Sequence, residues 1–344
     1  MKLGLIVFAN NGGIGIQTRR LAYMLKPDRL LAIDSSGFSK IKEQHFDWYE
    51  GFNGYRVNGF PSDQEVVVFL RGLTHVFCVE NPLNYNITTI AKRMGIKVFV
   101  QTNYEFCDFL NKPELTLPYK FLMPSYWKIK EMKQRFGEDK VDYLPPPIDP
   151  NEFKEAREVN FKRNGRPRFL HIVGTLAAND RNGTLDLLQA LKYTKSDFDL
   201  VIHSQQELPP EYMVNDQRVR YSMRSVENSC DLYKDFDALI LPRRYAGLCL
   251  PTNEALMSGL PVIMTDTSPN NELLPKEWLV KCYKSGQFMT RTMIDIYKSD
   301  VRDLARKINW LTKQKDDIKI QAFDLGYSNF SETVLSPKYK ELFV

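Results

Sequence analysis

The residues with the clearest capacity for chemistry lie in one stretch of the second half. A loop reading Pro-Arg-Arg-Tyr-Ala-Gly-Leu-Cys-Leu (242–250) leads into a helix begun by Pro251, and Gly259 ends that helix before an apolar strand. A helix start presents unpaired backbone N–H groups and the positive end of the helix dipole, which suit a diphosphate. Arg243 and the arginine after it would add positive charge. The alternative is that Glu254 only complements the helix dipole.

This stretch resembles the donor-site signature of GT-B glycosyltransferases, in the large retaining group that includes relatives of glycogen and sucrose-phosphate synthases. The positions in register are Gly247, Leu250, Pro251, Glu254, Ala255, Gly259, Pro261 and Val262. The resemblance implies that Glu254 binds the ribose hydroxyls of a nucleotide. It also implies that the loop backbone holds phosphate and sugar, at Gly247, Leu248, Cys249 and Leu250. The sugar-binding glutamate of the family falls on Ala246.

Further segments resemble the same family, so that the resemblance covers nearly the whole chain. The loop with Gly12, Gly13 and Gly15 resembles the N-terminal glycine loop, which approaches the donor phosphates and the acceptor. The family places an Arg and a Lys on the diphosphate at the start of the second domain. The residues of this chain that resemble that region are Gly174, Thr175, Arg181 and Asn182. Thr175 and Asn182 replace the two cations, so Arg181 is expected to take their place.

No catalytic nucleophile can be named from the residues. Asn103, Glu105 and Asp34 are candidates for contacting the acceptor or stabilising the front face of the sugar. A competing interpretation of the N-terminal half is an NAD-binding fold. Gly15 lies between a predicted strand and helix, and Asp34 follows it by 19 residues, where a dinucleotide enzyme places its ribose-binding acid. However, Thr18 stands where the third glycine of that motif belongs.

Alternating strands and helices must position these residues. In the first half the pattern predicts strands over 2–9, 30–33, 66–69, 76–79, 97–101 and 120–123, with helices over 16–25, 87–94 and 126–136. In the second half it predicts strands over 168–173, 200–203, 238–241 and 261–265, with helices over 185–191, 252–258 and 301–311. This alternation favours parallel sheets. The expected fold class is therefore α/β, and the resemblance specifies GT-B, with two Rossmann-like domains facing a central cleft.

The expected domain boundary follows from three consecutive prolines. Prolines cannot lie inside a helix or a central strand, so residues 145–166, which begin with these prolines and continue into a charged segment, are predicted to separate the domains. We expect residues 1–150 to form a Rossmann-like acceptor domain and 151–325 a Rossmann-like nucleotide-sugar domain. Residues 326–344 are expected to form a C-terminal helix that packs back on the N-terminal domain.

Composition narrows the class of protein. The 344 residues are 43% hydrophobic and 26% charged, which is ordinary for a globular protein and excludes collagen-like or largely disordered chains. The five cysteines contain no CxxC pair and the four histidines no metal-binding spacing, so neither a metal site nor a prosthetic group is predicted. Because no signal peptide or transmembrane-length apolar run is visible, we expect a cytoplasmic protein, in the host cytoplasm if phage-encoded.

The formal net charge of +5 permits a polyanionic partner. Basic residues that could contact DNA phosphates, or simply form solvated faces, are Lys128, Lys130, Lys133, Arg163 and Arg166. The loop over 243–251 resembles glycosyltransferases of bacteriophages, some of which modify hydroxymethylated pyrimidines in DNA. The expected function is metal-independent, retaining transfer of a sugar, with UDP-glucose as the expected donor, to such a base in double-stranded DNA. The alternatives are a glycan or lipid-linked acceptor, and a non-catalytic module that binds a nucleotide-sugar or glycan.

Overall fold

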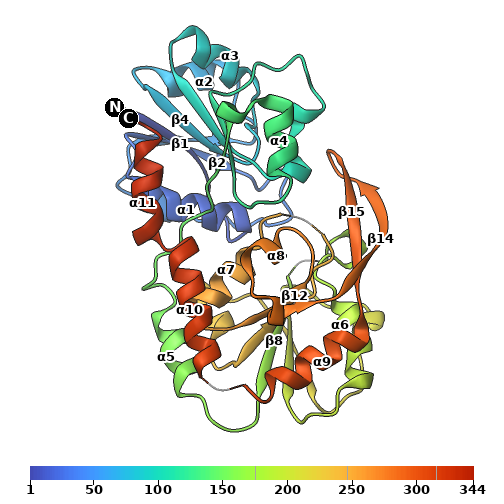
Figure 1. Ribbon diagram of the computed structural model, residues 1–344. Helices are drawn as coiled ribbons and strands as arrows, with labels where there is room; N and C mark the ends of the chain where they lie inside the picture. Colours follow the sequence, from blue (N-terminus) through green and yellow to red (C-terminus); the bar gives the residue numbers. More distant parts are fainter. Residues whose placement is uncertain (175, 246, 315) are drawn as a thin grey trace. The chain divides into compact units, whose positions relative to one another are not determined.

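The computed structural model describes residues 1–174, 176–245, 247–314 and 316–344. The chain forms two compact units, each built on a parallel β-sheet with helices packed against it (Figure 1). The N-terminal unit comprises residues 1–147, 290–292 and 332–344. The C-terminal unit comprises residues 148–289 and 293–331.

The sheet of the N-terminal unit runs in the order β3-β2-β1-β4-β5-β6-β7, with parallel neighbours throughout. The strands are β1 (Leu3–Phe8), β2 (Arg29–Asp34), β3 (Gly54–Asn58), β4 (His75–Val79), β5 (Lys97–Gln101), β6 (Lys120–Met123) and β7 (Val141–Tyr143). The helices are α1 (Gly13–Leu25), α2 (Asp63–Leu70), α3 (Asn86–Arg93), α4 (Ile129–Phe136) and α11 (Glu332–Glu341). Tyr339 of α11 and Phe343 beyond it pack edge-on against Phe77 and Phe99 of the central strands, so the end of the chain completes this core.

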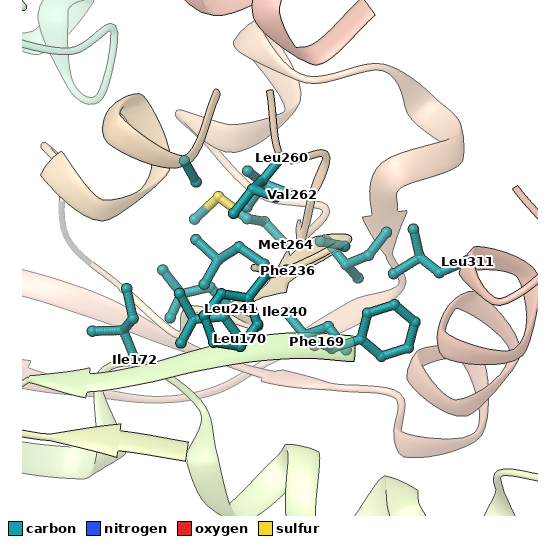
Figure 2. Close-up of a cluster of buried hydrophobic side chains, with 14 of the residues drawn as sticks. Phe169, Leu170, Ile172, Phe236, Ile240, Leu241, Leu260, Val262, Met264 and Leu311 are labelled. Carbon is teal, nitrogen blue, oxygen red and sulfur yellow. The ribbon is translucent and has the colours of Figure 1, made fainter. Parts of the chain in front are cut away.

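The sheet of the C-terminal unit runs in the order β10-β9-β8-β11-β12-β13. The strands are β8 (Arg168–Gly174), β9 (Asp199–Ser204), β10 (Val219–Met223), β11 (Ala238–Ile240), β12 (Val262–Thr265) and β13 (Leu279–Val280), and β14 (Cys282–Met289) and β15 (Met293–Ser299) form a separate antiparallel hairpin. The helices are α5 (Lys154–Lys162), α6 (Thr184–Ala190), α7 (Leu250–Met257), α8 (Asn270–Leu273), α9 (Val301–Leu311) and α10 (Asp317–Phe330). Figure 2 shows part of the core, a cluster of buried side chains that includes Phe169 and Leu170 of β8, Ile240 of β11 and Val262 of β12.

The structure corrects several predicted elements. Residues 66–69 are not a strand, because Ser62 and Glu65 form a reciprocal capping box that starts helix α2. The helix predicted from 126 begins only at 129, because Lys128 adopts a left-handed conformation with φ 60°. Strands β3 and β10, the hairpin and helix α5 were not predicted. The predicted terminal helix is divided at Ser331, between α10 and α11.

Candidate functional site

Each sheet has a topological switch point beside its first strand. In the C-terminal unit the chain leaves β8 for β9 and β10 on one side, then crosses to β11 on the other side. The loops that follow β8 and β11 therefore diverge at the carboxyl edge of the sheet, which is where open α/β sheets bind ligands. The same position in the N-terminal unit lies between β1 and β4.

Asp180 fixes the loop after β8 by capping helix α6. Its carboxylate accepts hydrogen bonds from the backbone N–H groups of Thr184 (3.0 Å) and Leu185 (2.9 Å), and burial raises the pKa of this carboxyl to about 6. His171 lies beside the same cap, with Nδ1 2.7 Å from the Ile240 carbonyl and Nε2 2.8 Å from the Thr184 hydroxyl. Burial lowers the pKa of His171 to about 4, so the neutral ring donates to the carbonyl through Nδ1 and accepts through Nε2. His171 is therefore a structural histidine.

Asn182 and Gly183 hold the same loop close to the sheet. The amide group of Asn182 donates to the carbonyl oxygens of Ile172 (3.0 Å) and Val173 (3.1 Å) at the end of β8. Gly183 adopts φ 71°, and a Cβ atom there would lie 2.1 Å from the carbonyl oxygen of Pro242. Only glycine fits so close an approach. Asn182 therefore braces the loop, and position 183 brings it against the loop after β11.

Arg181, the cation expected on the diphosphate, lies between the two anchored residues Asp180 and Asn182. Its carbonyl oxygen accepts a hydrogen bond of 2.8 Å from the backbone N–H of Arg244. A cavity of ≈ 10 Å³ lined in part by Arg181, Asp180 and Tyr212 adjoins the loop. It has room for about one water molecule, so it belongs to the packing of the loop and cannot hold a nucleotide. Gly174 precedes the loop with φ 68°, and Thr175 lies outside the described residues.

Helix α7 begins where the sequence places the donor signature. Its N-cap residue is Cys249. Among the described residues no side chain caps this end of the helix, and no acidic residue occupies the first turn. The positive end of the helix dipole is therefore not compensated, which suits an anion. Before the helix, Gly247 is buried, and Leu248, Cys249 and Leu250 are half-buried.

Glu254 lies one turn further along α7 and is 7% exposed. Its Oε2 accepts a 2.7 Å hydrogen bond from the hydroxyl of Tyr233, whose side chain is fully buried. Tyr233 thereby orients the carboxylate. The alternative that Glu254 complements the dipole in the first turn is wrong, because it stands beyond that turn.

The arginines after β11 bond to the protein's own backbone. Arg243 is 6% exposed, and its Nε donates to the Tyr245 carbonyl at 3.0 Å. Arg244 donates from Nε to the Tyr297 carbonyl (3.0 Å) and from Nη1 to the Asn179 carbonyl (3.1 Å). In this arrangement Arg243, predicted as a donor ligand, supports the loop through its Nε.

The glycine loop of the N-terminal unit lies at the β1–β4 switch point. Gly12 is the N-cap of α1 and Gly13 is its first residue. The Asn10 side chain organises the loop, because its Oδ1 accepts from the Gly12 N–H and its Nδ2 donates to the Ser35 hydroxyl, both at 2.8 Å. A Cβ at Gly15 would lie 1.8 Å from the Asn10 carbonyl oxygen, so glycine is required there.

Asp34 is occupied by neighbours at the end of β2. Its Oδ1 accepts from the Ser36 hydroxyl (2.7 Å) and backbone N–H (3.0 Å), and it forms an ion pair with Arg56. The hydrogen bonds from Ser36, aided by Arg56, lower the pKa of the Asp34 carboxyl. The Asp34 carboxylate is thus held by its neighbours at the end of β2.

Asn103 and Glu80 meet at the carboxyl ends of β5 and β4. The Asn103 amide donates to Glu80 Oε1 at 3.2 Å, and its own Oδ1 is buried without a hydrogen-bond partner among the described residues. Glu80 adopts φ 62°, an uncommon left-handed conformation for this residue. Sequence reasoning missed Glu80, although an acid directly after a buried strand was a usable signal. Glu105 is buried in the short 3₁₀ turn Tyr104–Phe106.

The residues expected to contact DNA are mostly paired with carboxylates. Lys128 lies 2.6 Å from Glu131 and Lys133 lies 2.7 Å from Glu138. Arg163, 12% exposed, contacts Asp235 and Asp237 at 3.2 and 2.9 Å, and Arg166 contacts Asp197 and Asp199 at 2.8 and 3.4 Å. Lys130 is exposed on α4. Arg163 therefore braces two segments of its own unit and is not presented to a phosphate.

No group of three or more His, Cys, Asp and Glu side chains among the described residues could hold a metal ion. None of the helices in the described ranges is long and apolar enough to cross a membrane.

Comparison with known proteins identifies the class. Residues 167–314 match the family described as glycosyl transferases group 1. No curated protein sequence matches the chain. Among solved structures, a glycosyltransferase from Rickettsia africae is 14% identical with a TM-score of 0.71, covering 99% of this chain and 98% of that one.

Two further structures are similar over their whole lengths. Anabaena HepE in complex with UDP is 12% identical with a TM-score of 0.70, covering 99% of both chains. Sucrose-phosphate synthase from Thermosynechococcus elongatus is 12% identical with a TM-score of 0.67, covering 100% of this chain and 98% of that one.

The fold is therefore GT-B, and the predicted class of two Rossmann-like domains is confirmed. With the family match over the C-terminal unit, the protein is a glycosyltransferase. This finding overturns the NAD-enzyme interpretation of the N-terminal half.

Proposed function

We propose that the C-terminal unit binds a nucleotide-sugar, with UDP-glucose as the donor, at the carboxyl edge between β8 and β11. The observation that carries the proposal is the position of the buried, Tyr233-oriented Glu254 on a helix whose start follows the loop after β11. Glu254 would accept hydrogen bonds from the ribose hydroxyls. Anabaena HepE, which has the same fold, is described in complexes with UDP and with UDP-glucose, and this supports the choice of donor.

The reaction we propose is transfer of the sugar to an acceptor hydroxyl with release of UDP. Negative charge develops on the leaving diphosphate, and Arg181 with the N-terminal end of α7 would stabilise it. The family resemblance favours retention of anomeric configuration without a metal ion. The acceptor would lie on the N-terminal unit, near the glycine loop after β1 and the Glu80–Asn103 pair.

For the acceptor we propose a sugar hydroxyl of a glycan or small saccharide. The expectation of a hydroxymethylated pyrimidine in DNA required cations available to several phosphates. Lys128, Lys133 and Arg166 already form ion pairs with carboxylates. Arg163, whose side chain is 12% exposed, is paired with two carboxylates as well. Each of these ion pairs would have to break before its cation could bind a DNA phosphate. A similar structure, sucrose-phosphate synthase, bears the name of an enzyme that makes a sugar phosphate.

The experiment is incubation with a panel of nucleotide-sugars and three acceptor types: saccharides, lipid-linked sugars and hydroxymethylated duplex DNA, with mass spectrometry of the products. We expect transfer from UDP-glucose to a saccharide, with little dependence on salt. Glycosylated duplex, with affinity falling steeply between about 50 and 200 mM salt, would instead establish the DNA acceptor. Failure of every donor and acceptor, without UDP release, would contradict the proposed reaction.

We also propose a cytoplasmic location. The cysteines are all free thiols, and those at 78 and 107 are buried, as is usual in a reducing compartment.

A further inference from the structure

The hairpin β14–β15 is an addition to the parallel sheet of the C-terminal unit. Its strands pair antiparallel from Cys282 opposite Ser299 to Met289 opposite Met293. Figure 1 shows it as a long two-stranded arm following β13. This arm contacts the loop after β11 at two consecutive residues, Arg244 and Tyr245.

Arg244 joins the hairpin to the loop after β8. Its backbone carbonyl accepts from the Tyr297 N–H (2.9 Å) and its Nε donates to the Tyr297 carbonyl (3.0 Å), so it bonds to both backbone groups of one residue of β15. On the other side, its backbone N–H donates to the Arg181 carbonyl (2.8 Å) and its Nη1 to the Asn179 carbonyl (3.1 Å). A single residue thus links three segments of the C-terminal unit.

Tyr245 also contacts both the hairpin and the loop after β8, through its ring and its hydroxyl group. Its ring meets Phe288 of β14 edge-to-face, with centroids 4.8 Å apart and planes at 71°. Its hydroxyl donates to the carbonyl oxygen of Ala178. Tyr245 is only 9% exposed, so both contacts are sheltered from water. Neighbouring residues therefore tie both strands of the hairpin to one short segment of the loop after β8.

That segment needs external support. Asn179 and Asp180 adopt φ values of 56° and 50°, in the left-handed region that residues other than glycine seldom occupy. Such conformations persist only where the surrounding structure holds them. The carbonyl groups of Ala178, Asn179 and Arg181 are the ones that Arg244 and Tyr245 hold.

We propose that Arg244 and Tyr245, backed by the hairpin, act as positioning residues that fix the loop after β8 relative to the loop after β11. We call this arrangement, with Tyr297 and Phe288, the clamp. The inference rests on the proposed donor site, because Arg181 belongs to one clamped loop and Gly247 lies two residues beyond Tyr245 in the other. Catalytic groups must be held within fractions of an ångström by packed neighbours. The hairpin supplies that support through Tyr297 and Phe288.

The test uses substitutions at Phe288, which lies on the hairpin outside the donor loops, and one substitution at its partner Tyr245 in the loop after β11. Phe288→Ala removes the ring contact with Tyr245, Phe288→Tyr retains it, and Tyr245→Phe removes only the bond to the Ala178 carbonyl. Tyr283→Ala is the matched control, because Tyr283 lies on the same strand, is 56% exposed and pairs across the hairpin with Lys298.

Hydrogen–deuterium exchange without nucleotide is the first readout. We expect amides of residues 177–181 to exchange about tenfold faster in Phe288→Ala, because protection reports the free energy of local opening. Phe288→Tyr and the Tyr283→Ala control should exchange like wild type. UDP affinity, measured by calorimetry, should fall about threefold to tenfold in Phe288→Ala and in Tyr245→Phe, the range for one lost contact or hydrogen bond.

Unchanged exchange over 177–181 in Phe288→Ala, with the hairpin still folded, would overturn the clamp. Equal changes in Tyr283→Ala would also overturn it, since they would indicate a general loosening of the hairpin. Failure of the wild-type protein to bind UDP would refute the proposed donor site, and the exchange measurement would still decide whether the clamp holds the loop.

Discussion

Replacement of Gly183 by alanine should destabilise the C-terminal unit strongly. Gly183 has φ 71°, and an alanine Cβ would lie 2.1 Å from the Pro242 carbonyl oxygen. The left-handed conformation alone costs alanine about 1–2 kcal/mol. Because both clashing atoms are fixed by the backbone, no rotamer change relieves the contact, and separating the two loops adds about 1–3 kcal/mol. We therefore expect a loss of about 2–5 kcal/mol in the free energy of unfolding.

Gly174 provides the matched control. It has φ 68°, nearly the same conformation, but among the described residues other than its chain neighbours no heavy atom lies within 4 Å of a Cβ built there. Gly174→Ala should lose only the conformational term of about 1–2 kcal/mol. Urea unfolding of both variants, followed by circular dichroism, measures the difference. Equal destabilisation of the two variants within about 0.5 kcal/mol would refute the argument that the two loops are pressed together at position 183.

Two other predictions concern the same loop. The raised pKa of Asp180, about 6 in the folded protein, means that its contribution to stability is present below its unfolded value of 3.8 and lost as pH rises through 6. The difference in stability between Asp180→Asn and wild type should therefore shift in favour of the variant as pH rises from 4 to 7, by at most about 3 kcal/mol, measured by urea unfolding at each pH. His171, whose pKa is lowered to about 4, destabilises the folded protein as pH falls, and this opposes the effect of Asp180 in wild type. The comparison of variant with wild type removes the His171 contribution. A stability difference that does not change with pH would therefore contradict the raised pKa of Asp180. Arg181→Ala should lower turnover about tenfold to a hundredfold at saturating substrates, a change of about 1.4–2.7 kcal/mol, and wild-type turnover would exclude Arg181 from the diphosphate.

The parallel strands could be predicted because they are buried on both faces. Residues 168–173 form a short apolar run bounded by charged and glycine-containing segments, and the structure has β8 there. The run over 66–69 has the same appearance, yet it belongs to helix α2. The Ser62–Glu65 capping box was the signal that distinguished them.

The hairpin was harder to predict because it is largely exposed. Strand β14 buries little apolar surface, so it lacks a hydrophobic run. In β15 only Ile294 and Ile296 alternate with more exposed neighbours, a weak two-residue period. The pattern was present but too short to identify a strand by itself.

The donor-site signature in the sequence located the start of α7 and Glu254. It could not predict the hydrogen-bond partners of Arg243 and Arg244. Arg244 bonds to carbonyl groups of residues 53 and 65 positions away in sequence. Tyr233, which orients Glu254, lies 21 positions away. Contacts of this kind depend on the fold, since any residue can supply a backbone carbonyl. Arg243 and Asn182 consequently look like ligand residues in sequence and bond to the protein backbone in the structure.

The most direct test of the donor site is calorimetric titration of UDP into wild type, Glu254→Ala and Glu277→Ala. Glu277 is an exposed glutamate of the same unit and serves as the control. We expect wild type and the control to bind UDP alike. Glu254→Ala should bind more weakly by about 1.5–3 kcal/mol, the range for charge-assisted hydrogen bonds, with its fold intact by circular dichroism. Equal affinity of all three proteins, or no binding by wild type, would contradict a nucleotide site built on Glu254.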